Sequence, residues 1–323
     1  MKYDFKWRKL FLAGIVGAVL TGMPMTAMAA NQDWNADAVI QEYTNRIAND
    51  ANNATAYQNR GAAYLRKGEL DKAISDLSRA IELRPDYADA YNNRGNAYQH
   101  KGEDKQAMAD YNKAIQYDPN NFVAYNNRGH IEAHLADYYH HSEQKAYADK
   151  YYAEALRDFS KAIELKPDYK EAYLNRGGLR SIFNHEQEAI SDYTRTIELD
   201  PTNYDAYVSR GTSYDALEKY DLAMADYNKA IEINPNEGLA YNNRGHIYLN
   251  QEKYDWAIRD FKKAIDNGDG SMYTYTNLGT AYYSVGQYDE AIDAYTCALS
   301  INQNFRPALE GLQSAYAAKE RRR

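Results

Sequence analysis

The amino-acid sequence predicts an all-α protein of stacked helical hairpins, and three observations support this prediction. The string Tyr-x-x-Arg-Gly, or a close relative, recurs with successive glycine spacings of 34, 34, 48, 34, 34 and 34 residues. Alanine and large side chains follow each string at spacings of three and four, the period of an amphipathic helix. Proline, which cannot continue a helix, closes the first five units. The recurring glycines are Gly61, Gly95, Gly129, Gly177, Gly211, Gly245 and Gly279.

The units are numbered so that this glycine is the eighth position of each. Seven units then cover 54–87, 88–121, 122–169, 170–203, 204–237, 238–271 and 272–305, the third with a 14-residue insertion. Position four is tyrosine and position twenty is alanine in every unit, and position twenty-four is leucine once and aromatic six times. Glycine and alanine let two helices approach closely while large side chains fill the space beside them. Each unit is therefore predicted to be a helical hairpin, which must stack on its neighbours to bury its apolar face.

Unit length, glycine, alanines, aromatics and closing proline together resemble the tetratricopeptide repeat over residues 54–305. The resemblance implies a right-handed superhelix of helix pairs, with the first helices lining a concave groove that holds peptide ligands. Two units depart from the pattern, because Asp269 and Gln303 stand where the others have proline. We expect the junctions after these two units to be looser or differently angled.

The two ends of the chain, residues 1–53 and 306–323, lie outside the seven repeats. Residues 1–29 have a basic start, a short apolar run and an Ala27-Met28-Ala29 exit, which predicts a secretory signal peptide. Residues 30–53 are predicted to contain an N-terminal capping helix. Residues 306–323 are predicted to form a C-terminal capping helix with a basic tail. The mature protein is expected to be periplasmic or secreted, without a membrane span.

Composition excludes several function classes. The formal net charge is −8 for the whole chain and −11 without residues 1–29, so binding to nucleic acid has no electrostatic support. Cys297 is the only cysteine, so no intramolecular disulfide can form. No glycine-rich phosphate loop, nucleophile elbow or cluster of metal ligands is present. The sequence therefore predicts no catalytic residue, no metal and no cofactor.

Arginine at position seven is accompanied by aspartate at position twenty-three in six units. The seventh unit loses both together, having Leu278 and Ala294. Joint presence and joint loss indicate ion pairs across each hairpin rather than a row of anion-binding arginines. The predicted pairs are Arg60 with Asp76, Arg94 with Asp110, Arg128 with Asp158, Arg176 with Asp192, Arg210 with Asp226 and Arg244 with Asp260.

Asparagine at position six forms a predicted ladder along the groove. Its members are Asn59, Asn93, Asn127, Asn175, Asn243 and Asn277, with Ser209 in the fifth unit. An amide both donates and accepts, so it can pair with the backbone of an extended peptide whatever its sequence. The ladder resembles the one in the repeat domain of O-linked N-acetylglucosamine transferase, which holds peptide backbone. Asparagine also bonds nearby backbone of its own chain, so both interpretations remain open.

Histidines cluster near the third unit. His130 and His134 are one helical turn apart, and His100 is the equivalent of His134 in the unit before. Two histidines are fewer than a zinc site needs, so contact with a peptide or with solvent is the favoured interpretation. Position five carries no lysine, which argues against the carboxylate clamp of chaperone-binding members of the family.

The insertion in the third unit contains no glycine or proline and stays compatible with helix. We expect it to lengthen both helices by about two turns and to move the bend to His140–Glu143. Tyr138, Tyr139 and Tyr147 would then form a second contact surface, or would pack the longer hairpin against itself.

The predicted function is a non-enzymatic scaffold that binds a peptide or protein partner in the groove, outside the cytoplasm. The alternative is a structural or oligomerising module, or an accessory subunit of an envelope complex. The sequence does not predict which partner is bound or the oligomeric state, since groove residues change while the fold is kept.

Overall fold

The computed structural model describes residues 35–322, and in this range the chain consists of sixteen α-helices joined by short turns. The predicted signal peptide lies outside the described residues. Within them, no helix is both long and apolar enough to cross a membrane. The described chain divides into two compact units, residues 35–183 and 184–322, and each is taken by itself.

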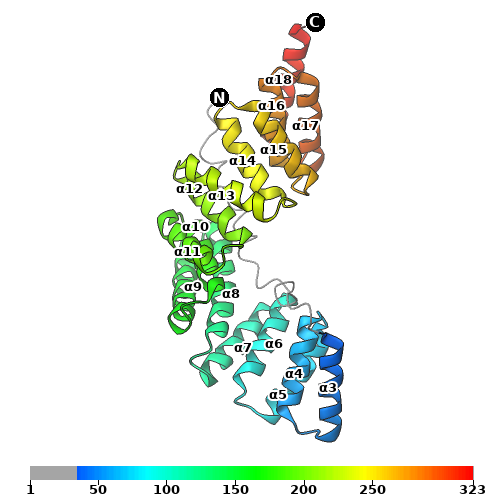
Figure 1. The fold of residues 1–323 in the computed structure, drawn as a ribbon, viewed down its shortest axis with the longest axis vertical. Helices are drawn as coiled ribbons and strands as arrows, with labels where there is room; N and C mark the ends of the chain where they lie inside the picture. The colour runs from blue at the N-terminus through cyan, green and yellow to red at the C-terminus, as the bar shows by residue number, and fades with distance from the viewer. Residues whose placement is uncertain (1–34, 323) are drawn as a thin grey trace. The chain divides into compact units, whose positions relative to one another are not determined.

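In the first unit, the N-terminal helix α3 (Ala36–Asn49) packs on the first of three hairpins (Figure 1). The hairpins are α4 (Ala54–Arg66) with α5 (Leu70–Leu83), α6 (Ala88–His100) with α7 (Asp104–Tyr117), and α8 (Phe122–His141) with α9 (Lys145–Leu165). The last helix, α10 (Lys170–Ile182), packs on α8 and α9. Each hairpin also packs on the next, so α3 corresponds to a lone second helix that closes this end.

The second unit has the same construction. It begins with α11 (Glu186–Leu199), which packs on α12. The hairpins are α12 (Tyr204–Ala216) with α13 (Tyr220–Ile233), α14 (Gly238–Asn250) with α15 (Tyr254–Asp266), and α16 (Met272–Ser284) with α17 (Tyr288–Ile301). The C-terminal helix α18 (Arg306–Arg322) packs on α16 and α17. The architecture is the stacking of helical hairpins that is typical of a tetratricopeptide-repeat superhelix.

The close approach of the two helices in a hairpin depends on the glycine at position eight. A Cβ atom on Gly95 would lie 2.6 Å from Cε1 of Tyr111, and one on Gly211 would lie 2.7 Å from Cε1 of Tyr227. Both tyrosines are almost completely buried, at 0% and 1% exposed. Alanines at positions twenty and twenty-seven are buried beside them, so the repeated pattern of small and large residues forms the core of each hairpin.

The insertion lengthens both helices of the third hairpin equally. Helix α8 has 20 residues where the other first helices have 13, and α9 has 21 where α5 and α7 have 14. Seven residues are close to two helical turns, so each helix keeps the same face toward its partner after the extension. Helix α8 continues to His141, and the bend covers residues 142–144.

The junction after the sixth repeat differs from the others, as the missing proline predicts, but the same expectation is wrong for the seventh repeat. Asn302 ends α17 in the extended conformation that Arg84 has after α5. Helix α15 ends at Asp266, and Gly268 then adopts a left-handed φ of 92°. Gly238 is required here, because a Cβ atom on it would lie 2.6 Å from the carbonyl oxygen of Ala264 and 2.7 Å from Cβ of Asp269. Asp269 accepts a hydrogen bond from Thr274 Oγ1 (3.4 Å), so a part-buried carboxyl group replaces the proline at this junction.

Candidate functional site

Five of the six predicted Arg–Asp pairs lie within one unit, and the structure forms all five. In each, Nε and Nη2 of the arginine donate to the two carboxylate oxygens at 2.6–2.8 Å. The aspartate side chains are at most 10% exposed. This two-bond geometry is the strong form of an Arg–carboxylate pair, so these arginines hold hairpins together. Arg176 and Asp192 belong to different units, and their pairing stays a prediction.

Each of the six arginines, Arg176 included, also reaches the preceding repeat, which was not predicted from the sequence. Nη1 donates to a side-chain oxygen at position twenty-five of the previous second helix at 2.6–3.2 Å. The acceptors are Thr44, Ser78, Asn112, Ser160, Thr194 and Asn228. A residue with a hydroxyl or amide side chain recurs at this position wherever the next unit has the arginine. This joint occurrence is the sequence signal from which the bond between repeats could have been predicted. The arginine therefore joins both the hairpin and the repeat junction.

Part of the asparagine ladder is used inside the protein. Asn127 Nδ2 donates to Asn96 Oδ1 (2.8 Å) and Asn92 Oδ1 (3.2 Å) of the repeat before it. Asn175 Nδ2 donates to Asn126 Oδ1 (3.0 Å) in the same way. These bonds are neither contacts with a ligand nor bonds to local backbone, the two alternatives that the sequence left open. They tie consecutive first helices together.

Accessibility separates the remaining ladder residues. Asn175 and Asn243 are 7% and 5% exposed, and Asn243 donates to Thr212 Oγ1 at 3.4 Å. In this conformation neither amide reaches a ligand in the groove. Asn59, Asn93 and Asn277 are part-exposed, and within residues 35–322 their side chains have no hydrogen-bond partner. These three are the ladder members that remain open to a ligand.

The predicted histidines lie in different environments. His130 is 4% exposed, its Nδ1 is 2.9 Å from Gln99 Nε2, and its Nε2 is buried without a hydrogen-bond partner. Burial and the neighbouring His134 lower the pKa of His130 from 6.5 to about 3, so its ring is neutral at physiological pH. His134 is exposed, and its ring meets that of His130 edge to face with centroids 4.5 Å apart. Burial also lowers the pKa of His100, the last residue of α6, although the residue is partly open to solvent.

Glu132 in the third repeat was not predicted from the sequence. Five other repeats have tyrosine at this position, and in four of them it packs against the arginine of position seven, as Tyr64 packs against Arg60 at 6.0 Å. Glu132 is 6% exposed, and its Oε2 atom has no hydrogen-bond partner. Burial, with the nearby Asp158 and Glu154, raises the pKa of Glu132 to about 8. The tyrosine pattern at this position is broken only by Glu132 and by Arg180 of the fourth repeat, and this departure was the signal that could have identified Glu132.

The predicted second contact surface lies on the lengthened hairpin. Tyr138 and Tyr147 are 62% and 53% exposed. Tyr139 stacks between Tyr147 and Tyr151, with ring centroids 5.0 and 5.6 Å apart. Some tyrosines therefore pack the hairpin against itself and others face solvent, and contact of the exposed ones with a partner stays a prediction.

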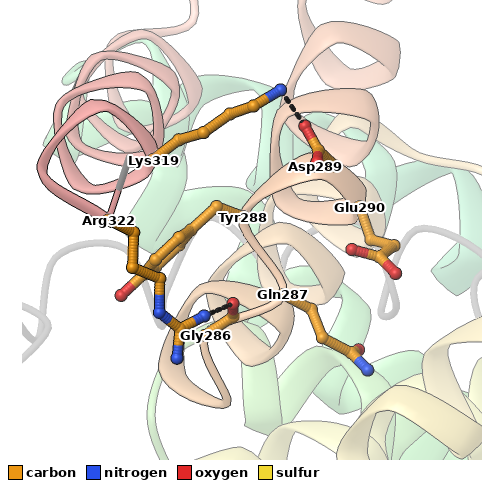
Figure 2. A pocket seen from close by; sticks show the side chains of 7 residues that line it. All are labelled: Gly286, Gln287, Tyr288, Asp289, Glu290, Lys319 and Arg322. Carbon is orange, nitrogen blue, oxygen red and sulfur yellow. Dashed lines mark hydrogen bonds and ion pairs between the residues drawn. The ribbon is translucent and has the colours of Figure 1, made fainter.

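The basic C-terminal end is bound to the last repeat rather than free in solvent. Arg322 Nη1 donates to the carbonyl oxygen of Gly286 (2.8 Å), and its guanidinium lies over the ring of Tyr288. Lys319, one helical turn before Arg322 on α18, forms an ion pair with Asp289 (Figure 2). The residues that make these contacts line a small open depression, and the contacts hold α18 against α17. Elsewhere in residues 35–322, no group of three His, Cys, Asp or Glu side chains is placed to hold a metal ion.

Comparison with known proteins agrees with the architecture. The tetratricopeptide-repeat family model matches residues 88–121, 204–237, 238–267 and 273–305, and a second model, described as TPR repeat, matches 63–102. A tetratricopeptide repeat protein from Parabacteroides merdae ATCC 43184 is 19% identical, with 81% of this chain and 98% of that one covered and a TM-score of 0.55. The anaphase-promoting complex (APC/C) hetero-tetramer Cut9–Hcn1 gives 20% identity, a TM-score of 0.55, and coverage of 84% of this chain but only 50% of that one. YrrB, described as a TPR protein with an unusual peptide-binding site, is 26% identical, with 61% and 95% covered and a TM-score of 0.47.

The stacked hairpins, with their recurring ion pairs and hydrogen bonds between repeats, define a helical repeat scaffold. The chain is a tetratricopeptide-repeat protein with multiple repeats. Such repeats mediate protein–protein interactions and typically form non-catalytic scaffolds.

Proposed function

We propose that this protein is a non-enzymatic scaffold that binds an extended peptide or protein segment along its first helices. The observation that carries the proposal is the contrast within the asparagine ladder. Asn127, Asn175 and Asn243 are used to join repeats, whereas Asn59, Asn93 and Asn277 are part-exposed and unpaired within residues 35–322. An exposed amide can donate to and accept from a peptide group at once, so these three match the needs of peptide backbone.

The test is capture of the partner from an envelope extract, followed by a binding measurement with the captured protein. One variant carries Asn59→Ala, Asn93→Ala and Asn277→Ala together. The control carries Asn120→Ala, Asn236→Ala and Asn304→Ala, which removes three exposed amides from the turns between repeats. Loss of the partner in the first variant and retention in the second supports the proposal. Equal retention by both contradicts it.

We further propose that the protein acts outside the cytoplasm, in the periplasm or beyond. The support is the anatomy of residues 1–29, with their basic start, apolar run and small-residue exit. Fractionation of the producing cells, with N-terminal sequencing of the recovered protein, tests this proposal. A mature N-terminus at Ala30 in an extracytoplasmic fraction is expected. A full-length cytoplasmic chain contradicts it.

A further inference from the structure

Three carboxylates gather around the start of helix α14 in the second unit. Asp205 lies in the first turn of α12, Glu237 directly precedes α14, and Asp269 lies in the junction before α16. The Tyr204 hydroxyl accepts a hydrogen bond from the backbone N–H of Ala240 (3.2 Å), which holds the start of α12 on α14. Asp269 packs against Gly238, where a Cβ atom would lie 2.7 Å from Cβ of Asp269. Burial, together with the charges of Glu237, Asp205 and Asp269, raises the pKa of the Tyr204 hydroxyl, so all three carboxylates lie near this side chain.

These acidic residues have no counter-ion in the described part of the chain. No lysine, arginine or histidine forms an ion pair with any of the three among residues 35–322. Burial on its protein side, together with Glu237, raises the pKa of Asp205, although the residue keeps a solvent-exposed edge. Burial also raises the pKa of Asp269, against the opposing effect of hydrogen bonds from Asn242 and Thr274. Without a cationic partner in the described chain, the ionised form of these carboxylates is destabilised, and a bound cation would stabilise it.

Two buried oxygen atoms beside the carboxylates lack donors. Asn242 is 2% exposed, and its Oδ1 has no hydrogen-bond partner; Asp269 Oδ2 is buried and unpartnered as well. The amide oxygen at the same repeat position normally has a donor: Asn92 Oδ1 accepts from Asn127, and Asn126 Oδ1 accepts from Asn175. A buried acceptor left unpaired costs about 1–3 kcal/mol, so this site favours a ligand that brings N–H donors.

The groove positions of the same repeats add to the negative field. By the family geometry these are positions two, five, six, nine, twelve and thirteen. In repeats five to seven they include Asp205 and Asp215 but no lysine or arginine. A surface that carries charge of one sign attracts a partner of the other sign.

We propose that the cluster of Asp205, Glu237, Asp269 and Asn242 binds a lysine or arginine side chain of the peptide partner. This inference rests on the proposed scaffold function and assigns a chemical preference to its groove. An ammonium or guanidinium group supplies both positive charge and several N–H donors, which the unpaired oxygens need. A metal ion does not fit, because no three such ligands among residues 35–322 are placed to share one.

The test measures binding of labelled model peptides to the purified protein by fluorescence anisotropy. Three peptides of one scaffold sequence carry lysine, glutamine or glutamate at the same places. One variant combines Asp205→Asn, Glu237→Gln and Asp269→Asn. The control variant, Asp221→Asn with Asp255→Asn and Glu290→Gln, removes the same number of charges from exposed positions on the second helices.

The unchanged protein and the control variant are expected to prefer the lysine peptide. The cluster variant is expected to bind it about 10- to 100-fold more weakly, the usual effect of losing a desolvated charge partner. Because the substitutions relieve repulsion between carboxylates, thermal unfolding of the cluster variant should occur at the same temperature or higher, which separates loss of binding from loss of fold.

Equal binding of the lysine peptide by the cluster variant and the unchanged protein overturns the inference. Equal binding of all three peptides, or binding of none, overturns it too. In each of these cases the scaffold function still stands if the Asn59, Asn93 and Asn277 variant loses the captured partner. If that variant also keeps the partner, the groove itself is not the binding surface.

Discussion

Arg128 and Asp158 are separated by 30 residues in the chain, yet they form the same two-bond pair as Arg60 and Asp76, which are separated by 16. The 14 inserted residues between them leave the pair unchanged because seven enter each helix. The alignment of the two helices at this pair is therefore the same in the longer hairpin as in the others.

Removing one member of this pair should cost more stability than removing both. Arg128→Leu leaves Asp158, whose side chain is 5% exposed, as a buried and uncompensated charge. We expect a loss of about 3–5 kcal/mol for Arg128→Leu and a clearly smaller loss for Arg128→Leu combined with Asp158→Ala. Urea unfolding measures both. Leu278 and Ala294 are the natural form of the double substitution, and equal losses for the two variants would argue against the pairing.

Glu132 should make the protein less stable as pH rises. Its pKa is raised from 4.5 to about 8, so the folded state binds the proton more tightly than the unfolded chain. The stabilisation is complete below pH 4.5 and is lost as pH rises through about 8. The free energy of unfolding should fall by up to about 1.4 kcal/mol per pH unit in this window. Glu132→Gln should abolish this decline, and a Glu132→Gln variant with the same pH profile as the unchanged protein would refute the assignment.

His130 should produce the opposite dependence on the acid side. Its pKa is lowered from 6.5 to about 3, so the folded state disfavours the proton. The stabilisation is complete above pH 6.5 and is lost as pH falls through about 3. His130→Asn introduces the residue that the second repeat has at this position, Asn96, and it cannot titrate. Thermal unfolding between these pH values should show a smaller acid loss for this variant, whereas an unchanged loss would place the acid sensitivity elsewhere.

The turn after a first helix should become more stable when glycine is introduced. Glu218 has a φ of 59° at the position where Gly102 has 75°. A residue with a side chain is strained in this region, so Glu218→Gly should stabilise the protein by about 0.5–1 kcal/mol. Glu218→Ala, which removes the carboxylate but keeps the Cβ atom, is the control. A gain from the alanine variant equal to that from glycine would assign the effect to charge instead of backbone.

Much of the fold could be predicted from the sequence because the repeat shows both its unit length and the spacing of its apolar residues. The Tyr-x-x-Arg-Gly string located the first helices, and the joint loss at Leu278 and Ala294 indicated the ion pairs. The bonds between repeats were harder to predict. Whether Asn127 faces a ligand or Asn96 depends on the distance between adjacent first helices, which the spacing along one chain does not specify. The environment of Glu132 likewise depends on the folded hairpin, which places Asp158 and Glu154 of α9 near it, and not on its neighbours in sequence.

The candidate site was only partly predictable for the same reason. The ladder contains one residue type at one repeat position, yet Asn175 is buried and Asn93 is part-exposed. The acidic cluster combines residues from the fifth and sixth repeats, and one of them, Asp269, lies in a junction that departs from the pattern. Irregular positions of this kind become a site only after the hairpins have stacked.

Hydrogen–deuterium exchange with and without the captured partner tests most directly whether a partner segment lies along the first helices. Binding should slow exchange in α4, α6, α14 and α16, which carry Asn59, Asn93, Asn242 and Asn277, and should leave α5, α7, α13 and α15 unchanged. Protection confined to these second helices, or to the extended ends of α8 and α9 around Tyr138 and Tyr147, would contradict this placement.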